Sequence, residues 1–202
     1  MARVKICGIN DPDAFDAAVG ADWIGFVFFP QSPRFVSVEA ARDLSARHPG
    51  GPLRVGLFVN PAQDAIAAVL AGVKLDILQI YGPAKGLRER FGLPVWRPVG
   101  VSVAAELPDA MNGADALLIE AKPPRNATRP GGNALRFDWA ITQGWRAPGD
   151  WILAGGLDPG NVAAAIRESG APAVDVSSGV ERAKGVKDPA LIHAFIAAAR
   201  GV

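Results

Sequence analysis

Short apolar runs rich in β-branched residues alternate along this chain with longer segments in which Ala, Leu, Glu and Arg recur at helical spacing. Runs of the first kind are typical of buried strands and those of the second kind of helices, so the pattern predicts a repeated strand–helix unit. The expected strands are Arg3–Cys7, Trp23–Phe28, Leu53–Val59, Ile77–Ile80, Val95–Pro98, Ala116–Ile119, Trp151–Ala154 and Ala173–Val176. The clearest helical segments are Ala62–Leu70, Asn161–Ser169 and Pro189–Arg200.

Eight such strands fit the smallest closed α/β barrel, because their starts recur about every 25 residues, the spacing of one strand–helix unit. We therefore expect an α/β fold in which residues 1–202 form a single (β/α)8 TIM barrel domain. A doubly wound open sheet is the alternative. That fold would normally carry a glycine-rich fingerprint after its first strand, where this chain reads Cys7-Gly8-Ile9-Asn10, so the barrel is favoured.

Composition and charge narrow the classes of function. Half of the 202 residues are hydrophobic and a fifth are charged, which excludes a disordered chain, and the longest apolar run, Trp23 to Phe29, is too short to cross a bilayer. The 21 Lys and Arg against 20 Asp and Glu give a formal net charge of +1, so no broad attraction to nucleic acid or membranes is expected. The first residues show no secretory signal pattern. We expect a cytoplasmic protein, monomeric or homodimeric, that recognises a small molecule.

The cysteine and histidine content argues against a metal centre. Cys7 is the only cysteine, which excludes an internal disulfide and a cysteine-based zinc site. The two histidines, His48 and His193, lie in segments predicted to be helical, and neither has an acidic residue at metal-ligand spacing. We expect neither a catalytic metal nor another cofactor.

The residues at the carboxyl ends of the strands are the candidates for chemistry, because barrel enzymes place their active sites at that rim. The first strand ends at Cys7, the sixth leads into Glu120, and the eighth carries Asp175. A lone cysteine at a strand end is more often a small buried hydrophobe. Opposite a carboxyl group, however, its thiolate could form a base–acid pair, whereas a nucleophilic role would normally need a histidine that no strand end provides.

Two turns after the seventh and eighth strands are rich in glycine and serine. They contain Gly155 and Gly156, and then Ser177, Ser178 and Gly179. Glycines let backbone N–H groups approach an anion and hydroxyls add donors, so these turns predict the phosphate site that barrels of this class share.

An arginine and a long loop are also predicted to lie at the carboxyl ends of the strands. Arg34 follows Ser32-Pro33 after the second strand, and its planar guanidinium suits a substrate carboxylate. The stretch from Lys122 to Ala134 follows the sixth strand and is interpreted as an active-site loop, with a surface insertion as the alternative. These positions together predict a proton-transfer isomerase acting on an elongated dianionic ligand.

Seven blocks of sequence resemble the phosphoribosylanthranilate isomerase family, in order along nearly the whole chain. They are Lys5-Ile6-Cys7-Gly8-Ile9, Gly25-Phe26-Val27-Phe28 with Ser32-Pro33-Arg34, Val55-Gly56-Leu57-Phe58-Val59, Leu78-Gln79-Ile80, Gly131-Gly132 with Phe137-Asp138-Trp139, Leu153-Ala154-Gly155-Gly156-Leu157, and Val174-Asp175-Val176-Ser177-Ser178-Gly179-Val180-Glu181. The resemblance implies the Amadori rearrangement of N-(5-phosphoribosyl)anthranilate to 1-(2-carboxyphenylamino)-1-deoxyribulose 5-phosphate, a step of tryptophan biosynthesis that needs no metal or cofactor.

The resemblance also implies roles for individual residues. Cys7 would be the general base that removes the C2′ proton, Glu120 the general acid, and Arg34 the partner of the anthranilate carboxylate. Asp175 would be a polar group at the base of the site. The phosphate would be held by Gly155, Gly156, Ser177, Ser178 and Gly179.

Three positions depart from the family pattern. The acid of the sixth strand is usually aspartate and here is Glu120, Tyr81 stands where histidine is usual, and the usual Gly-Gly-Thr-Gly of the long loop reads Gly131-Gly132-Asn133-Ala134. Two other functions stay open at this point. One is another phosphosugar barrel enzyme, and the other is a ligand-binding barrel of the same family whose catalysis is weakened at Glu120.

Overall fold

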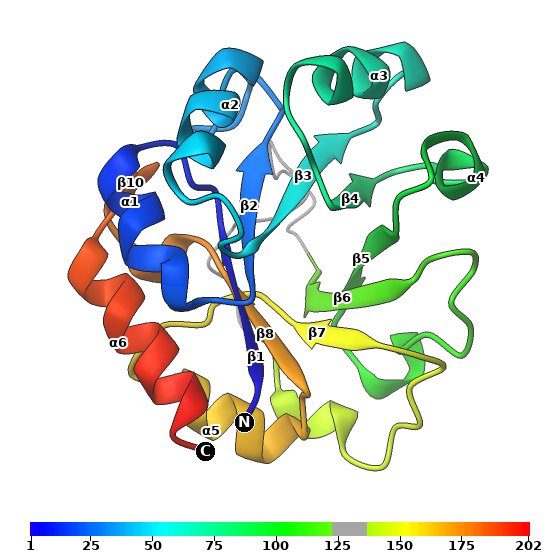
Figure 1. The fold of residues 1–202 in the computed structure, drawn as a ribbon. Coiled ribbons are helices and arrows are strands. Elements are labelled where there is room, and N and C mark those ends of the chain that lie inside the picture. Colours follow the sequence, from blue (N-terminus) through cyan, green and yellow to red (C-terminus); the bar gives the residue numbers. More distant parts are fainter. Residues whose placement is uncertain (123–136) are drawn as a thin grey trace.

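The computed structural model describes residues 1–122 and 137–202, which form a closed barrel of eight parallel strands in the order β1 to β8 (Figure 1). β1 closes the barrel by pairing with β2 on one side and with β8 on the other. The strands are β1 (Arg3–Cys7), β2 (Trp23–Val27), β3 (Leu53–Val59), β4 (Ile77–Tyr81), β5 (Val95–Val101), β6 (Ala116–Ala121), β7 (Trp151–Leu153) and β8 (Ala173–Val176). The expected fold is confirmed.

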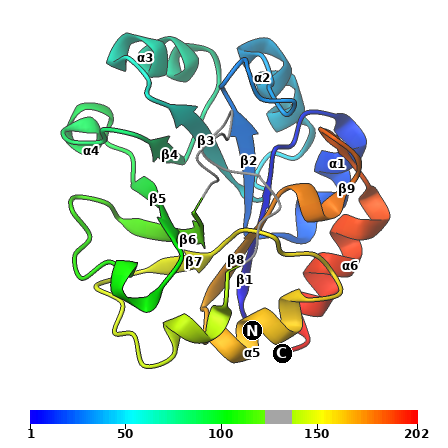
Figure 2. The same cartoon turned by 180° about the vertical axis from the view of Figure 1, so that it is seen from behind.

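Helices lie outside the strands, and the two termini lie side by side in both views (Figure 2). The α-helices are α1 (Pro12–Ala17), α2 (Val38–Arg47), α3 (Gln63–Gly72), α4 (Leu87–Phe91), α5 (Val162–Ser169) and α6 (Pro189–Arg200). The short 3-10 helices are η1 (Ala18–Gly20), η2 (Ala104–Glu106), η3 (Trp139–Thr142) and η4 (Ser178–Val180). The connection from β5 to β6 therefore contains a 3-10 turn in place of a full helix, as does the described part of the connection from β6 to β7.

Three strands are longer than the sequence pattern predicts, and β2 and β7 each end one residue earlier than expected. β4 runs to Tyr81 instead of ending at Ile80. β5 runs to Val101 instead of ending at Pro98, and β6 runs to Ala121 instead of Ile119. Proline removes one N–H donor, but β5 pairs with β4 only as far as Trp96, so Pro98 falls where that ladder has already ended. On its other side β5 stays paired with β6 beyond Pro98, and this extension brings Glu120 into the barrel wall.

A small hairpin after β8 is absent from the sequence-based prediction. Strand β9 (Glu181–Ala183) pairs antiparallel with β10 (Val186–Lys187), and η4 connects the hairpin to β8. Each strand is only two or three residues long, too short for an alternating pattern to show. The long loop predicted to belong to the active site lies, apart from Lys122, outside the described residues, and so does the departure at Ala134.

The interior of the barrel is filled at its amino-terminal end by an apolar plug. The plug consists of Trp23, Val55, Ile77, Trp96, Ala116, Leu118, Ile152 and Ala173. The rings of Trp23 and Trp96 meet edge to face with centroids 5.1 Å apart. Successive strand residues point to opposite sides of a barrel wall, so the plug takes every second residue and the others pack against the surrounding helices. A separate and larger apolar core fills the space between strands and helices.

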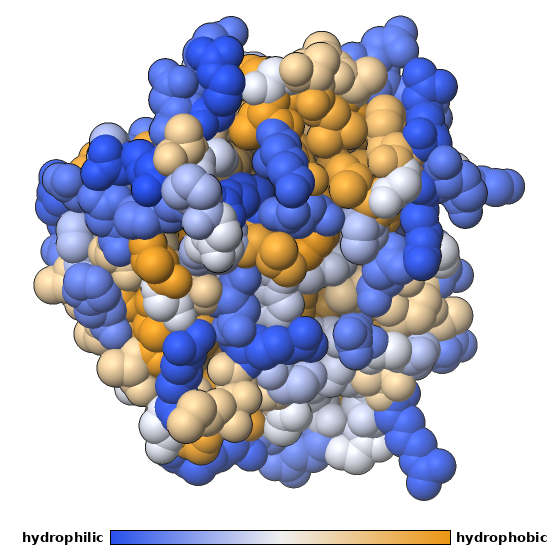
Figure 3. Space-filling view, in the orientation of Figure 1, coloured by the Kyte–Doolittle hydropathy of each residue, from blue (hydrophilic) through white to orange (hydrophobic). Residues whose placement is uncertain are grey.

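The α-helices α1, α2 and α6 each begin at a residue whose side chain caps the helix. The Asp11 side chain accepts a hydrogen bond from the Ala14 N–H at 2.9 Å to cap α1, and Asp188 caps α6 directly before Pro189. Figure 3 shows hydrophilic residues over most of one face and apolar residues gathered around α2 and α3. In the part of the chain that the structure describes, no helix combines the length and apolar character needed to cross a membrane.

Candidate active site

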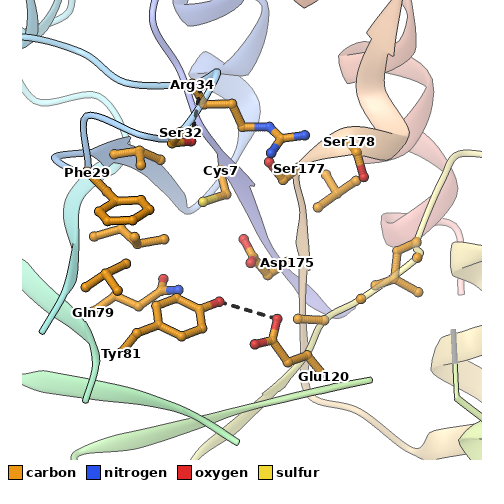
Figure 4. A pocket seen from close by; sticks show the side chains of 18 residues that line it. Cys7, Phe29, Ser32, Arg34, Gln79, Tyr81, Glu120, Asp175, Ser177 and Ser178 are labelled. Atoms are coloured by element: carbon orange, nitrogen blue, oxygen red, sulfur yellow. Dashed lines mark hydrogen bonds between the residues drawn. The ribbon is translucent and has the colours of Figure 1, made fainter. Parts of the chain in front are cut away.

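A pocket opens at the carboxyl ends of the strands and gathers nearly all of the predicted site residues (Figure 4). Those that line it are Cys7, Arg34, Glu120, Gly155, Gly156, Asp175, Ser177 and Ser178. Gly179 does not line it, because the backbone at this position packs directly against the carbonyl of Leu157 in the neighbouring turn. The expectation that the strand ends converge is thus met by the geometry.

Cys7 is the last residue of β1 and its thiol is buried at the edge of this pocket. Burial raises the pKa of Cys7 above its ordinary value, because a thiolate is poorly solvated there. The positive charges of Lys5 and Lys187 lower this pKa, and the carboxylate of Asp175 raises it. The thiolate at this position therefore depends on the cations around it.

Asp175 lies in this view between Cys7 and Glu120 (Figure 4), and it forms an ion pair with Lys5. Lys5 Nζ donates to Asp175 Oδ1 at 2.8 Å, and the Lys5 side chain is fully buried. The register of β1 on β8 places these two residues directly opposite each other. Asp175 is therefore one half of a buried ion pair in the wall of the site.

Glu120 projects into the same pocket from β6 and is only 8% exposed. Burial raises its pKa to about 8, the nearby charge of Asp175 adds to this, and a hydrogen bond from Tyr81 opposes it. The Tyr81 hydroxyl donates to Glu120 Oε2 at 3.3 Å, and burial keeps the pKa of that phenol well above its usual value. At neutral pH Glu120 is thus a protonated carboxylic acid with a neutral donor beside it.

Arg34 is held rigidly at the opposite side of the mouth. Its Nε and Nη2 groups donate to the two carboxylate oxygens of Glu181 at 2.6 and 3.0 Å, and both side chains are buried. Nη1 donates to no protein atom within residues 1–122 and 137–202, and the residue lines the pocket. The guanidinium group therefore binds Glu181 through Nε and Nη2 and leaves Nη1 to donate to a ligand.

The two glycine- and serine-containing turns lie side by side on the β7–β8 side of the pocket. Gly155 and Gly156 have φ angles of 87° and 65°, which side-chain-bearing residues rarely adopt. Lys187, a fully buried cation of β10, donates to the Ser177 carbonyl at 2.8 Å and to Glu181 Oε1 at 3.0 Å. One hairpin residue thus fixes both the serine turn and the carboxylate that orients Arg34.

The side of the pocket formed by β2, β3 and β4 is mainly apolar. Val27, Leu57 and Val59 line it together with the ring of Phe29. Gln79 also lines it, and its buried Oε1 accepts no hydrogen bond from the described residues. The pocket therefore combines an apolar surface large enough for a ring with an acceptor that a ligand can satisfy.

Gln79 and four further charged or polar residues of the site are not among those singled out from the sequence. Lys5, Glu181 and Lys187 form its buried ion pairs, and Tyr81 was noted only as a departure from the family pattern. A signal for Lys5 was present, because strand alternation puts it on the same side of β1 as Cys7 and a charge inside a barrel needs a partner. Lys187 had no comparable signal, since its hairpin strand has two residues.

The geometry suits the transfer of protons on a ligand with two anionic groups. The Cys7 thiol and the protonated Glu120 carboxyl group face one pocket. The Arg34 guanidinium group lies at one side of this pocket, and the glycine and serine turns after β7 and β8, which suit a phosphate, lie at another.

Comparison with known proteins agrees with this arrangement. The sequence model of the family described as N-(5'-phosphoribosyl)anthranilate (PRA) isomerase matches residues 4–198. The N-(5'-phosphoribosyl)anthranilate isomerase of Acidiphilium cryptum is 59% identical over 98% of this chain and 98% of its own.

Solved structures show the same likeness. The crystal structure of phosphoribosyl anthranilate isomerase from Thermotoga maritima is 37% identical with a TM-score of 0.86, and all of both chains is covered. A phosphoribosyl anthranilate isomerase in complex with reduced 1-(o-carboxyphenylamino)-1-deoxyribulose 5-phosphate is 36% identical with a TM-score of 0.84, again over both whole chains. The chain belongs to the N-(5'-phosphoribosyl)anthranilate isomerase family.

Proposed function

We propose that this chain isomerises N-(5'-phosphoribosyl)anthranilate, with Cys7 as general base and Glu120 as general acid. The observation that carries the proposal is the placement of a buried thiol and a buried carboxyl group, whose pKa is raised to about 8, on the walls of one pocket. A carboxyl group that stays protonated at neutral pH can give its proton to a leaving oxygen. Membership of the family supports the identity of the substrate.

The proton transfers balance without any co-reactant. Glu120 protonates the ribose ring oxygen as the C1′–O4′ bond breaks, and the anthranilate nitrogen supplies the electron pair that forms the C1′=N bond. The Cys7 thiolate then removes the C2′ proton to give an enolamine. A proton moves from the C2′ hydroxyl to C1′ as the ketone forms, and proton exchange between Cys7, solvent and Glu120 restores the enzyme.

Binding is divided among three parts of the pocket. The free Nη1 edge of Arg34 suits the anthranilate carboxylate, and the wall of Val27, Leu57 and Phe29 suits the aromatic ring. The turns of Gly155, Gly156, Ser177 and Ser178 suit the phosphate, with the Gly179 backbone supporting the second turn. Gln79 can accept a hydrogen bond from a ribose hydroxyl or from the linking nitrogen.

The decisive experiment follows turnover of phosphoribosylanthranilate spectroscopically and binding of the reduced product analogue calorimetrically. Turnover by the parent, with loss of turnover but retained binding in Cys7→Ala and Glu120→Gln, is the expected result. Binding without turnover in the parent would show a weakened ligand-binding barrel. Absence of binding would indicate a different phosphosugar enzyme. Lys74→Gln, at an exposed lysine that does not line the pocket, is the control.

We also propose that the enzyme works in the cytoplasm, as a monomer or a homodimer. A base that acts as a thiolate requires Cys7 to stay reduced, and reducing compartments maintain that state. Sedimentation equilibrium, with and without the product analogue, measures the number of subunits.

A further inference from the structure

Lys5 is a cation enclosed inside the barrel wall, beneath the pocket and not in it. Its side chain is fully buried, it does not line the pocket, and its Nζ lies 2.8 Å from Asp175 Oδ1. A buried charge is costly even when it is paired, and an apolar pair of similar volume would often be as stable. Stability alone therefore gives no reason for an ion pair at this place.

The position of Lys5 relative to Cys7 gives such a reason. The two residues are alternate members of β1, so their side chains share the inner side of the strand. Cys7 pairs with Gly25 of β2, and the side chains of Lys5 and Cys7 both pack against the side of Gly25 where a Cβ would stand. A Cβ at Gly25 would lie 3.0 Å from Cys7 Sγ and 3.2 Å from Lys5 Nζ. The ammonium group and the thiol are thus near neighbours, and both are buried.

The charged and titratable groups around the thiol come from several elements. They are Lys5 on β1, Asp175 on β8, Lys187 on β10 and Tyr81 on β4, with Glu120 on β6 and Arg34 after β2 across the pocket. Among these groups, the positive charge of Lys5 lowers the pKa of Cys7 the most. This lowering is larger than the rise in the same pKa caused by the negative charge of Asp175.

We propose that Lys5 is a positioning residue that holds Cys7 available as a thiolate, and that Asp175 keeps Lys5 charged and directed at the thiol. This inference rests on the proposed function and assigns Asp175 a place in it. Lys5 acts only through Cys7, because an enclosed ammonium group outside the pocket lining cannot contact substrate. Since the thiolate is the minor form at neutral pH, each unit by which its pKa falls raises the amount of active base about tenfold.

The test uses the fact that Cys7 is the only cysteine, so any thiol signal reports this residue alone. The thiolate is titrated by ultraviolet absorbance and by the pH dependence of alkylation in the parent, in Lys5→Gln and in the control Lys74→Gln. Glutamine keeps an N–H donor for Asp175 but removes the charge. Loss of an adjacent opposite charge should raise the thiol pKa by about one unit or more. Accordingly, kcat/KM at neutral pH should fall about tenfold while KM stays within about twofold.

A second variant covers the case in which Lys5→Gln folds poorly. The double variant Lys5→Gln/Asp175→Asn replaces the ion pair by two neutral amides, and the thiol pKa should still rise, by less, because the effect of Lys5 exceeds that of Asp175. A thiol titration that stays at the parent value in a folded variant overturns the proposal. So does a shifted titration with an unchanged kcat/KM. If the parent has no turnover at all, the proposed function fails, yet the titration still reports the coupling of Lys5 to Cys7.

Discussion

The apolar plug and the mouth of the barrel use the same alternating positions of the strands, yet on β6 and β8 they contain opposite kinds of residue. On β6, Leu118 belongs to the plug and Glu120, two residues further on, lies in the mouth. On β8, Ala173 belongs to the plug and Asp175 to the mouth. One step of strand alternation therefore separates the part that stabilises the barrel from the part suited to chemistry.

The comparison indicates that the plug stabilises the barrel, whereas the charged residues at the mouth lower its stability. The plug buries apolar surface and needs no partners. At the mouth, Asp175 needs its ion pair with the enclosed Lys5, and Glu120 needs protonation, to be tolerated in a buried position. Substitutions in the plug should thus change folding without changing chemistry. Substitutions at the mouth should do the reverse.

The largest effect is expected for Cys7→Ala, which would sharpen this comparison. Removing a general base should lower kcat by about 10²–10⁴-fold, while the smaller buried side chain alters the fold little. Stopped-flow or steady-state turnover measures the first effect and thermal unfolding the second. Turnover close to that of the parent would remove Cys7 from the mechanism.

Glu120→Gln should lower kcat by about 10²-fold or more and abolish the limb of the pH profile set by this group. It should also raise stability at alkaline pH. A carboxyl group whose folded pKa is raised from 4.5 to about 8 contributes stability that is present below 4.5 and is lost as pH rises through about 8. The parent should therefore lose on the order of a few kcal/mol of unfolding free energy across that window.

Urea titrations at pH 5 and pH 9 measure this difference directly. The neutral glutamine does not ionise, so the variant should lack the loss and should gain on the parent between the two pH values. Equal pH dependence of the two proteins would mean that Glu120 is not the buried acid.

Leu118→Ala is the matched change on the plug side of the comparison. Truncating a fully buried leucine should cost about 2–5 kcal/mol of unfolding free energy through lost burial and a residual cavity. The pH profile and KM should stay unchanged, because Leu118 does not line the pocket. Denaturant unfolding and steady-state kinetics on the same preparation measure both. A shifted pH profile would show that the plug also controls the chemistry and would break the distinction.

The fold could be predicted further than the site could. Each strand is a short apolar run, so all eight were found, and β1, β3 and β8 have the predicted bounds. The rim residues could be predicted as well, because barrel geometry fixes which strand end faces the mouth. Glu181 and Lys187 could not, since their partners depend on how a short hairpin folds back over Arg34.

The hydrogen bond between Tyr81 and Glu120 is another feature that could not be predicted from the sequence. The place of Tyr81 at the end of β4 could be predicted from the sequence, but its contact with Glu120 crosses from β4 to β6, strands that are not neighbours. No local pattern reports a contact of that kind. Only the closed barrel brings the two side chains together over one pocket.

The smallest effect is expected for Tyr81→Phe, which removes one hydroxyl from the mouth and leaves the ring in place. That hydroxyl donates to Glu120 Oε2 and favours the ionised form, so its loss should raise the pKa of Glu120 further. A single hydrogen bond contributes about 0.5–1.5 kcal/mol and one pKa unit corresponds to about 1.4 kcal/mol, so the limb set by Glu120 should move up by about half a unit to one unit. Glu120→Gln and Glu120→Gln/Tyr81→Phe are the controls, and their profiles should coincide because the titrating group is gone. A limb that moves down, or the same shift in the absence of Glu120, would mean that Tyr81 acts on another group.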